Sequence, residues 1–148
     1  MRKASVKRET GETRITLTLV LEGSGRSDIK TGIGFFDHML THVARHGLFD
    51  LDVSAEGDLE VDAHHTVEDV GICLGKAFLQ ALGDMKGIRR FGHAVIPMDE
   101  TLAEASIDFS GRPFLRFDGD LPCGKAGEFD SELAEEFFRA FAINSRAT

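Results

Sequence analysis

The chain contains little cysteine, no long apolar run and fewer basic than acidic residues. Its 148 residues include only two cysteines, Cys73 and Cys123, and their wide separation excludes a closely spaced metal-binding pair. Cys73 falls inside an apolar helical pattern, so a buried free thiol is favoured over a disulfide. A reducing cytosol is therefore the expected location.

The lack of long apolar runs argues against a membrane protein, because a spanning helix needs about 20 consecutive apolar residues. The N-terminal segment MRKASVKRET has no apolar core of the kind that signal peptides contain. Lys and Arg total 17 against 25 Asp and Glu, which gives a formal net charge of −8. This balance argues against nucleic acid as a partner, although a few local arginines could still hold a small anion.

The remaining composition, 42% hydrophobic and 28% charged, is that of an ordinary globular chain. The length suits one compact domain. Alternating apolar residues predict strands, and apolar residues three or four apart predict helices. The predicted helices cover residues 35–45, 62–82 and 131–142, and the predicted strands cover 4–9, 14–23, 48–57, 58–62, 93–99, 101–110 and 113–119.

Single residues indicate where the predicted helices end and which of their faces are buried. Gly47 follows the first helix at the place of a C-cap, and Asp62 is a suitable N-cap for the second. Gly71 and Gly75 lie one turn apart in the second helix, where glycine is costly, so they indicate a closely packed neighbour. The predicted inward stripes are Phe36, Met39, Leu40 and Val43 in the first helix and Leu133, Phe137, Phe138 and Phe141 in the third, with Asp130 or Ser131 as the cap of the third.

The order of the elements suggests an internal repeat. GFFDHML begins the first helix, and GEFDSEL leads into the third. The first unit would cover residues 1–86 and would contain strands, a helix, strands and a second helix. The second unit, residues 87–148, would contain strands and one helix only, and the third helix would then pack on a helix that these residues do not include.

The segment VDAHHTVEDVGICLG carries the strongest chemical signal. His64 and Glu68 lie one helical turn apart, and His65 lies on the other flank of Glu68. The two imidazoles therefore diverge, which predicts two half-sites: one built by His64 and Glu68, the other by His65, with further ligands from elsewhere or from a second subunit. The alternative is a polar helix start without ligands. Neutral imidazoles, which the positive helix N-terminus favours, are the form that binds metals.

The first helix adds His38, His42 and His46, spaced by four residues and thus on one face. His38 would reach the start of the His64 helix if the two helices packed side by side, whereas His42 fits a solvated polar face equally well. Histidine and glutamate ligands without cysteine suit Mn, Fe or Zn. Arg89, Arg90 and Arg112 are either surface charges or holders of a phosphate or carboxylate.

These segments resemble a known family. RETGETRI, TGIGFFDHML, DAHHTVEDVGICLG, GIRRFGHAVIPMDE and DFSGRPFL are similar, in this order, to motifs of imidazoleglycerol-phosphate dehydratase, an enzyme of histidine biosynthesis. The resemblance covers residues 2–148. It implies an α+β fold of two similar halves in tandem, each a mixed β-sheet with two helices packed on one face, the second half being incomplete in this chain.

The resemblance also implies the site. His38, His64, His65 and Glu68 match metal ligands, with Mn²⁺ as the expected metal and Zn²⁺ or Fe²⁺ as alternatives. Glu12 matches a carboxylate that contacts the substrate and moves protons, and Glu68 is the second catalytic carboxylate. The implied assembly is a homo-oligomer of twenty-four subunits with metal sites between subunits. The residues expected to contact the phosphate substrate are Glu12, His38, His46, His64, Arg90 and Arg112.

The chemistry expected of such an enzyme is a dehydration without a redox cofactor. A metal bound to the imidazole of the substrate would favour loss of the hydroxyl, and Glu12 would shuttle the carbon proton. The family pattern continues with a second His-His-x-x-Glu helix that is not among these residues. One alternative is therefore an inactive domain that keeps the fold and half of the ligands. A zinc hydrolase is disfavoured because the closing His of helical zinc-hydrolase motifs is missing.

Overall fold

The computed structural model describes residues 1–119, 121 and 124–148, so Cys123 lies outside the described part. A four-stranded sheet in the order β1-β2-β4-β3 forms its base. The strands are β1 (Lys3–Glu9), β2 (Thr13–Val20), β3 (Ser27–Lys30) and β4 (Asp50–Gly57). β1, β2 and β4 are antiparallel neighbours, whereas β3 runs parallel to β4.

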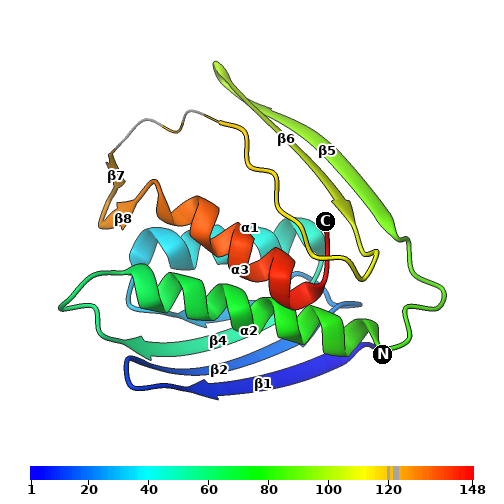
Figure 1. The fold of residues 1–148 in the computed structure, drawn as a ribbon, viewed down its shortest axis with the longest axis horizontal. Coiled ribbons are helices and arrows are strands. Elements are labelled where there is room, and N and C mark those ends of the chain that lie inside the picture. Colours follow the sequence, from blue (N-terminus) through cyan, green and yellow to red (C-terminus); the bar gives the residue numbers. More distant parts are fainter. Residues whose placement is uncertain (120, 122–123) are drawn as a thin grey trace.

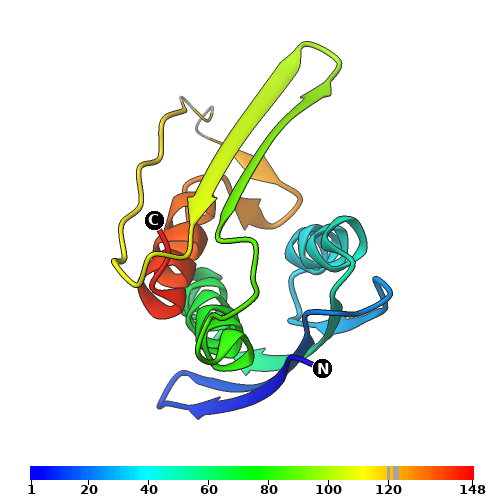
Figure 2. The same cartoon turned by 90° about the vertical axis from the view of Figure 1, so that its right-hand side faces the viewer.

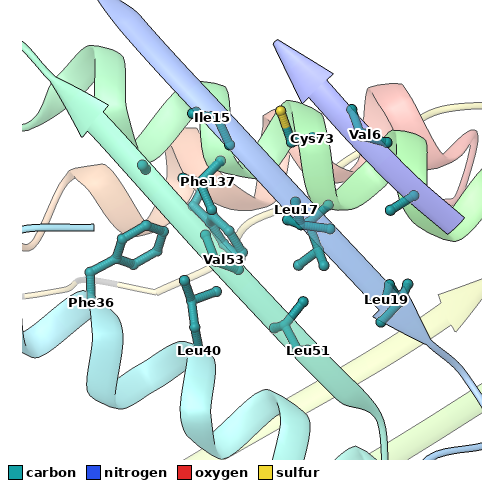
Figure 3. Packing of buried hydrophobic residues seen from close by; sticks show 14 of the residues in the cluster. Val6, Ile15, Leu17, Leu19, Phe36, Leu40, Leu51, Val53, Cys73 and Phe137 are labelled. Atoms are coloured by element: carbon teal, nitrogen blue, oxygen red, sulfur yellow. The ribbon is translucent and has the colours of Figure 1, made fainter. Parts of the chain in front are cut away.

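Alternation explains why the sheet has one apolar face. In β2 the side chains of Ile15, Leu17 and Leu19 are at most 1% exposed, while the residues between them face outward. Figure 3 shows these side chains packed with Leu51 and Val53 of β4. The outward face carries hydroxyl and charged groups, such as the hydrogen-bonded pair Ser5–Thr18 and the ion pair Arg26–Asp52.

Two helices cover the apolar face, α1 (Gly34–Gly47) over β3 and β4, and α2 (His64–Leu82) mainly over β1 and β2. A third helix, α3 (Leu133–Ser145), lies on the outer side of α2 (Figures 1 and 2). Because α2 is covered by the sheet on one side and by α3 on the other, it is apolar around most of its circumference. Cys73 is a buried free thiol on α2, as predicted.

Gly71 and Gly75 are the contact points between α2 and α3, which confirms the prediction of a closely packed neighbour. A Cβ atom on Gly71 would meet the carbonyl oxygen of Phe137 at 2.9 Å, and one on Gly75 would meet that of Phe141 at 2.7 Å. The absent side chains let the backbones approach each other. Leu133 and Phe137 of the apolar stripe of α3 are buried, and within these residues α3 packs on α2.

The rest of the chain forms smaller units. β5 (Phe91–Met98) and β6 (Thr101–Asp108) make an antiparallel hairpin that projects away from the helices (Figure 2). β7 (Lys125–Ala126) and β8 (Phe129–Asp130) form a short hairpin before α3. Thr148 pairs with the end of β6, where the two backbones exchange hydrogen bonds with Asp108 of 2.8 and 2.9 Å.

Several sequence predictions are wrong in detail. Residues 58–62 form a turn, in which the Val61 amide donates a hydrogen bond to the Asp58 carbonyl. The side chains of Asp58 and Asp62 hydrogen-bond to the first residues of α2, so the segment does not extend as a strand. Residues 113–119 form no strand, since alternation makes a strand only beside a bonding neighbour. The sequence predicts no strand at β3, because its four residues alternate too briefly to reveal a strand that pairs with β4.

The predicted stripes and caps also need correction. Met39 and Val43 are 37% and 38% exposed, and Phe138 is 47% exposed, so each stripe is narrower than predicted. Leu48, and not Gly47, takes the left-handed conformation after α1. The N-cap of α2 is Ala63 in place of Asp62, and the N-cap of α3 is Glu132 in place of Asp130 or Ser131. No helix among the described residues is long and apolar enough to cross a membrane.

Candidate functional site

The topology gathers several predicted site residues at one edge of the sheet. β3 and β4 are parallel and lead into α1 and α2, so both helices begin where these strands end. The β1–β2 turn lies at the same edge, because Thr13 at the start of β2 pairs with Gly57 at the end of β4. We call this the helix-start edge. It carries the predicted residues Glu12, His38, His64, His65 and Glu68.

The start of α2 has the predicted geometry. The Asp62 carboxylate accepts a 2.8 Å hydrogen bond from the His64 amide, just before the helix begins. His64 Nε2 lies 4.0 Å from Glu68 Oε2, and both side chains are nearly half exposed. The His64 and His65 rings are 6.1 Å apart and nearly perpendicular. The imidazoles therefore diverge, and His64 and Glu68 share one flank.

His65 has a partner that the sequence did not reveal. Its Nδ1 lies 2.9 Å from Asp58 Oδ2, in the turn after β4. This hydrogen bond is the largest cause of the raised pKa of His65, burial opposes it, and the charges of Asp58, Glu12 and Asp62 add to it. A neutral His65 that donates from Nδ1 to Asp58 presents the lone pair of Nε2 to a ligand. No fixed spacing in the sequence signals a partner seven residues away across a turn.

The histidines of α1 form a connected row. His42 Nε2 lies 3.1 Å from His38 Nε2, and His42 Nδ1 lies 3.2 Å from His46 Nε2. All three side chains are exposed. His42, which fitted a solvated polar face equally well, therefore bridges a predicted metal ligand and a predicted substrate contact.

The predicted phosphate-binding arginines lie at the opposite edge. A loop joins the C-terminal end of α2 to β5 (Figure 1), and in this loop the Lys86 carbonyl accepts a hydrogen bond from Arg2, which precedes β1. α2 has 19 residues, which makes it about 28 Å long. Within one chain, the structure therefore does not bring Arg90 or Arg112 to His64.

Arg90 is already engaged in an ion pair. Its guanidinium makes two hydrogen bonds to the Asp108 carboxylate, of 2.6 and 3.0 Å, and lies over the Phe91 ring at 4.9 Å. The bonds from Arg90 are the main cause of the lowered pKa of Asp108, to which the charge of Arg112 contributes. Asp108 is thus paired with Arg90 and also feels the charge of Arg112, so two guanidinium groups and one carboxylate lie at the foot of the β5–β6 hairpin, with an excess of positive charge.

The described ranges 1–119, 121 and 124–148 contain no group of three His, Cys, Asp or Glu side chains close enough to hold a metal ion. His38 does not join His64 because α1 covers β3 and β4 while α2 covers mainly β1 and β2. A hollow of about 450 Å³ lies at the start of α3. Its carboxylates Asp130, Glu132 and Glu135 disfavour a phosphate, and it contains none of the predicted site residues.

Comparison with known proteins gives consistent matches. The family model of imidazoleglycerol-phosphate dehydratase matches residues 31–148. The imidazoleglycerol-phosphate dehydratase of Acetivibrio thermocellus is 61% identical over 147 residues, which are 99% of this chain and 75% of that protein. That of Exiguobacterium sp. is 61% identical over 148 residues, 100% of this chain and 76% of that protein.

Solved structures agree. The crystal structure of imidazoleglycerol-phosphate dehydratase from Staphylococcus aureus has a TM-score of 0.88 at 41% identity, covering 99% of this chain and 80% of that one. The enzyme from Pyrococcus furiosus, in complex with (S)-C348, has a TM-score of 0.82 at 36% identity, covering 97% of this chain and 76% of that one. The chain therefore spans about three quarters of the length of these relatives.

Proposed function

Because the chain belongs to the imidazoleglycerol-phosphate dehydratase family, we propose that it dehydrates D-erythro-imidazole glycerol phosphate to imidazole acetol phosphate in histidine biosynthesis. The reaction removes a proton from carbon and a hydroxide from the neighbouring carbon, as a carbon–oxygen lyase does. The observation that carries the proposal is the helix-start edge, where the β1–β2 turn and the first turns of both helices meet. This edge holds every motif residue expected to bind metal or move protons.

The donors at this edge fit a divalent metal. His65 is oriented by Asp58 so that Nε2 is available, and the adjacent His64–Glu68 pair offers one imidazole and one carboxylate. Imidazole and carboxylate donors without thiolate suit Mn²⁺, with Fe²⁺ or Zn²⁺ as alternatives. We infer that His38, His64, His65 and Glu68 would contribute ligands. When bound, the metal would supply Lewis-acid chemistry at the imidazole of the substrate.

A carboxylate of this chain would remove the proton from the substrate carbon. Glu12 is exposed in the β1–β2 turn, and its backbone carbonyl is bonded to Asp58, the hydrogen-bond partner of His65, so the turn adjoins the proposed ligands. From there Glu12 would take the carbon proton as a general base, a role worth about 10²–10⁴-fold in rate. The Asp58 amide donates a 3.1 Å hydrogen bond to the Glu12 carbonyl, which holds the turn in place.

The separation of the two edges supports a site shared between subunits. The imidazole and the phosphate of one small substrate cannot reach both ends of a helix about 28 Å long. We infer a homo-oligomer in which Arg90 and Arg112 of one subunit face the helix-start edge of another. The test mixes two variants, Glu68→Gln and Arg90→Ala, under conditions that exchange subunits. Recovered activity in the mixture supports a shared site, and activity equal to the sum of the two separate variants contradicts it.

The direct test of function is turnover of the substrate by the purified chain with Mn²⁺. Glu68→Gln should weaken Mn²⁺ binding, measured by calorimetry, while the helical circular dichroism stays unchanged. Glu56→Gln, an exposed carboxylate on the outer face of β4, is the matched control and should bind Mn²⁺ as the wild type does. A folded, metal-loaded protein that does not turn over the substrate contradicts the proposal.

We also infer that the chain is one domain of two related units, residues 1–86 and 87–148. Each unit begins with an antiparallel strand pair, β1–β2 or β5–β6. Each also has a Gly-x-Phe-Asp segment, which forms the first turn of α1 in one unit and shortly precedes α3 in the other. Phe36 and Phe129, the phenylalanines of these two segments, stack on each other at 5.9 Å. Contact between matching residues of two units is expected where the units are related by approximate twofold symmetry.

A further inference from the structure

A buried polar cluster links the β1–β2 turn to α2. The Asp69 side chain of α2 is 8% exposed and faces the sheet. Its Oδ2 accepts a 2.5 Å hydrogen bond from the hydroxyl of Thr13, and its Oδ1 lies 2.9 Å from Nε of Arg8. A buried carboxylate is costly unless it is paired and hydrogen-bonded. The charge of Asp69 is therefore compensated by the Thr13 hydroxyl and by the ion pair with Arg8.

Both ends of the Thr13–Asp69 bond adjoin a proposed catalytic carboxylate. Thr13 follows Glu12, and Asp69 follows Glu68. The bond joins residues 56 positions apart, and it is a direct side-chain link between the turn that carries Glu12 and the helix that carries the proposed ligands. A change in this bond would alter the distance between Glu12 and the ligands without touching either.

The turn around Glu12 is stiff, so the position of Thr13 determines that of Glu12. The Thr10 hydroxyl accepts hydrogen bonds from the backbone amides of Glu12 and Thr13, at 3.1 and 2.9 Å. The Thr10 amide donates a 2.9 Å hydrogen bond to the Thr13 carbonyl. On the other side, the Glu12 carbonyl accepts the Asp58 amide. Glu12 is thus fastened between Thr13 and Asp58, and Asp58 in turn orients His65.

We propose that Thr13 and Asp69 are positioning residues for the dehydration, which set the Glu12 carboxylate relative to His64, His65 and Glu68. This inference rests on the proposed function. The hydroxyl of Thr13 touches no substrate in this arrangement, because it is buried against Asp69. Its contribution is geometric, and a misplacement of about 1 Å can lower a catalysed rate about a hundredfold.

The test replaces Thr13 by Val, which keeps the shape of the side chain and removes the hydroxyl, and with it the bond to Asp69 and the 3.2 Å contact with the Thr10 hydroxyl. We expect kcat to fall about 10–100-fold, with KM and Mn²⁺ affinity within threefold of the wild-type values. The kinetic isotope effect for substrate deuterated at the carbon that loses its proton should rise, because proton transfer becomes slower. Thr13→Ser, which retains the hydroxyl, should restore kcat to within threefold of the wild-type value.

Thr18→Val is the matched control. It makes the same change in the same strand, at a hydroxyl that bonds to Ser5 on the outer face of the sheet, and it should leave kcat and the isotope effect unchanged. If Thr13→Val does not fold, Asp69→Asn is measured in its place with the same expectation. A folded variant with wild-type kcat and isotope effect overturns the proposal.

A second measurement does not depend on activity. Hydrogen exchange of the Asp58 amide, which donates to the Glu12 carbonyl, reports whether the turn stays in place in the metal-free protein. Exchange at least tenfold faster in Thr13→Val than in Thr18→Val is expected. Unchanged exchange would refute the positioning role, whereas loss of turnover in the wild type itself would refute the proposed function and leave this measurement valid.

Discussion

Replacing Gly75 by Ala should destabilise the protein, although Ala favours helices. In an open helix this change stabilises by about 1 kcal/mol. At Gly75 the new Cβ would meet Phe141 O at 2.7 Å, and Asn144 Cβ and Ser145 N each at 2.9 Å. Two of these three atoms belong to the backbone of α3, so relief requires the whole helix to shift. Overpacking of this kind costs about 1–3 kcal/mol, and the backbone contacts favour the upper end.

The expected net effect of Gly75→Ala is a loss of about 2 kcal/mol in the free energy of unfolding. In a chain of this length, that corresponds to a fall in Tm of roughly 5–8 °C. The stability of Gly71→Ala should lie between those of Gly75→Ala and the wild type. One of the two nearest atoms to its new Cβ belongs to the Ala140 side chain, at 3.0 Å, and not to the backbone of α3. Gly34→Ala is the matched control, since nothing lies within 4 Å of its Cβ at the exposed start of α1.

The assay is urea and thermal unfolding of all four proteins at one protein concentration, because assembly would otherwise shift the apparent stability. The expected order of stability is Gly34→Ala, wild type, Gly71→Ala and Gly75→Ala. If Gly75→Ala stabilised the protein as much as Gly34→Ala did, α2 and α3 would not be packed at the distance described, and the account of these glycines would be refuted.

Three further predictions concern single side chains. Asp50→Asn should lower the unfolding free energy at pH 7. Backbone hydrogen bonds from the loop after β2 are the main cause of the lowered pKa of Asp50. The carboxylate therefore stabilises the fold above its unfolded pKa of about 3.9, and this stabilisation is lost as pH falls through the folded pKa. The urea midpoints of wild type and Asp50→Asn should accordingly converge in acid. Arg90→Ala should raise KM about 10–100-fold with a smaller effect on Tm, because its ion pair with Asp108 is partly exposed to solvent; an unchanged KM would contradict a role in phosphate binding. Cys73, whose pKa burial raises to about 11, should react with a thiol reagent at pH 8 only after unfolding, measured in a Cys123→Ser background, and rapid reaction of the folded protein would show that the thiol is accessible.

Local pattern was sufficient for the main elements. The alternation of Ile15, Leu17 and Leu19 identified a half-buried strand, because side chains alternate between the faces of any sheet. The spacing in the His64–Glu68 segment predicted diverging imidazoles, since helical geometry determines the angle between successive side chains. The two glycines of α2 predicted a close helix contact. Glycine destabilises a helix interior, and close packing of a neighbouring backbone is one of the few features that offset this loss.

Partners distant in the sequence could not be predicted in this way. The parallel pairing of β3 with β4 depends on a crossover through α1, and four residues carry too short an alternation to reveal it. The Asp58–His65 bond needs the turn after β4, which the sequence presented as a strand. In each case the local pattern is weak, and the pairing becomes favourable only when the sheet and helices are already in place.

The sequence by itself determined which residues can do chemistry, because ligand type and helical spacing are local properties. Only the tertiary structure decided how these residues are grouped. It gathers Glu12 and the start of α2 at one edge of the sheet, and it places the loop between α2 and β5, which contains Arg90, at the other. The physical reason is that strand direction and helix length set distances across a domain, and both depend on contacts between segments far apart in the chain. The Thr13–Asp69 bond, across 56 positions, exists only because β2 and α2 pack against each other.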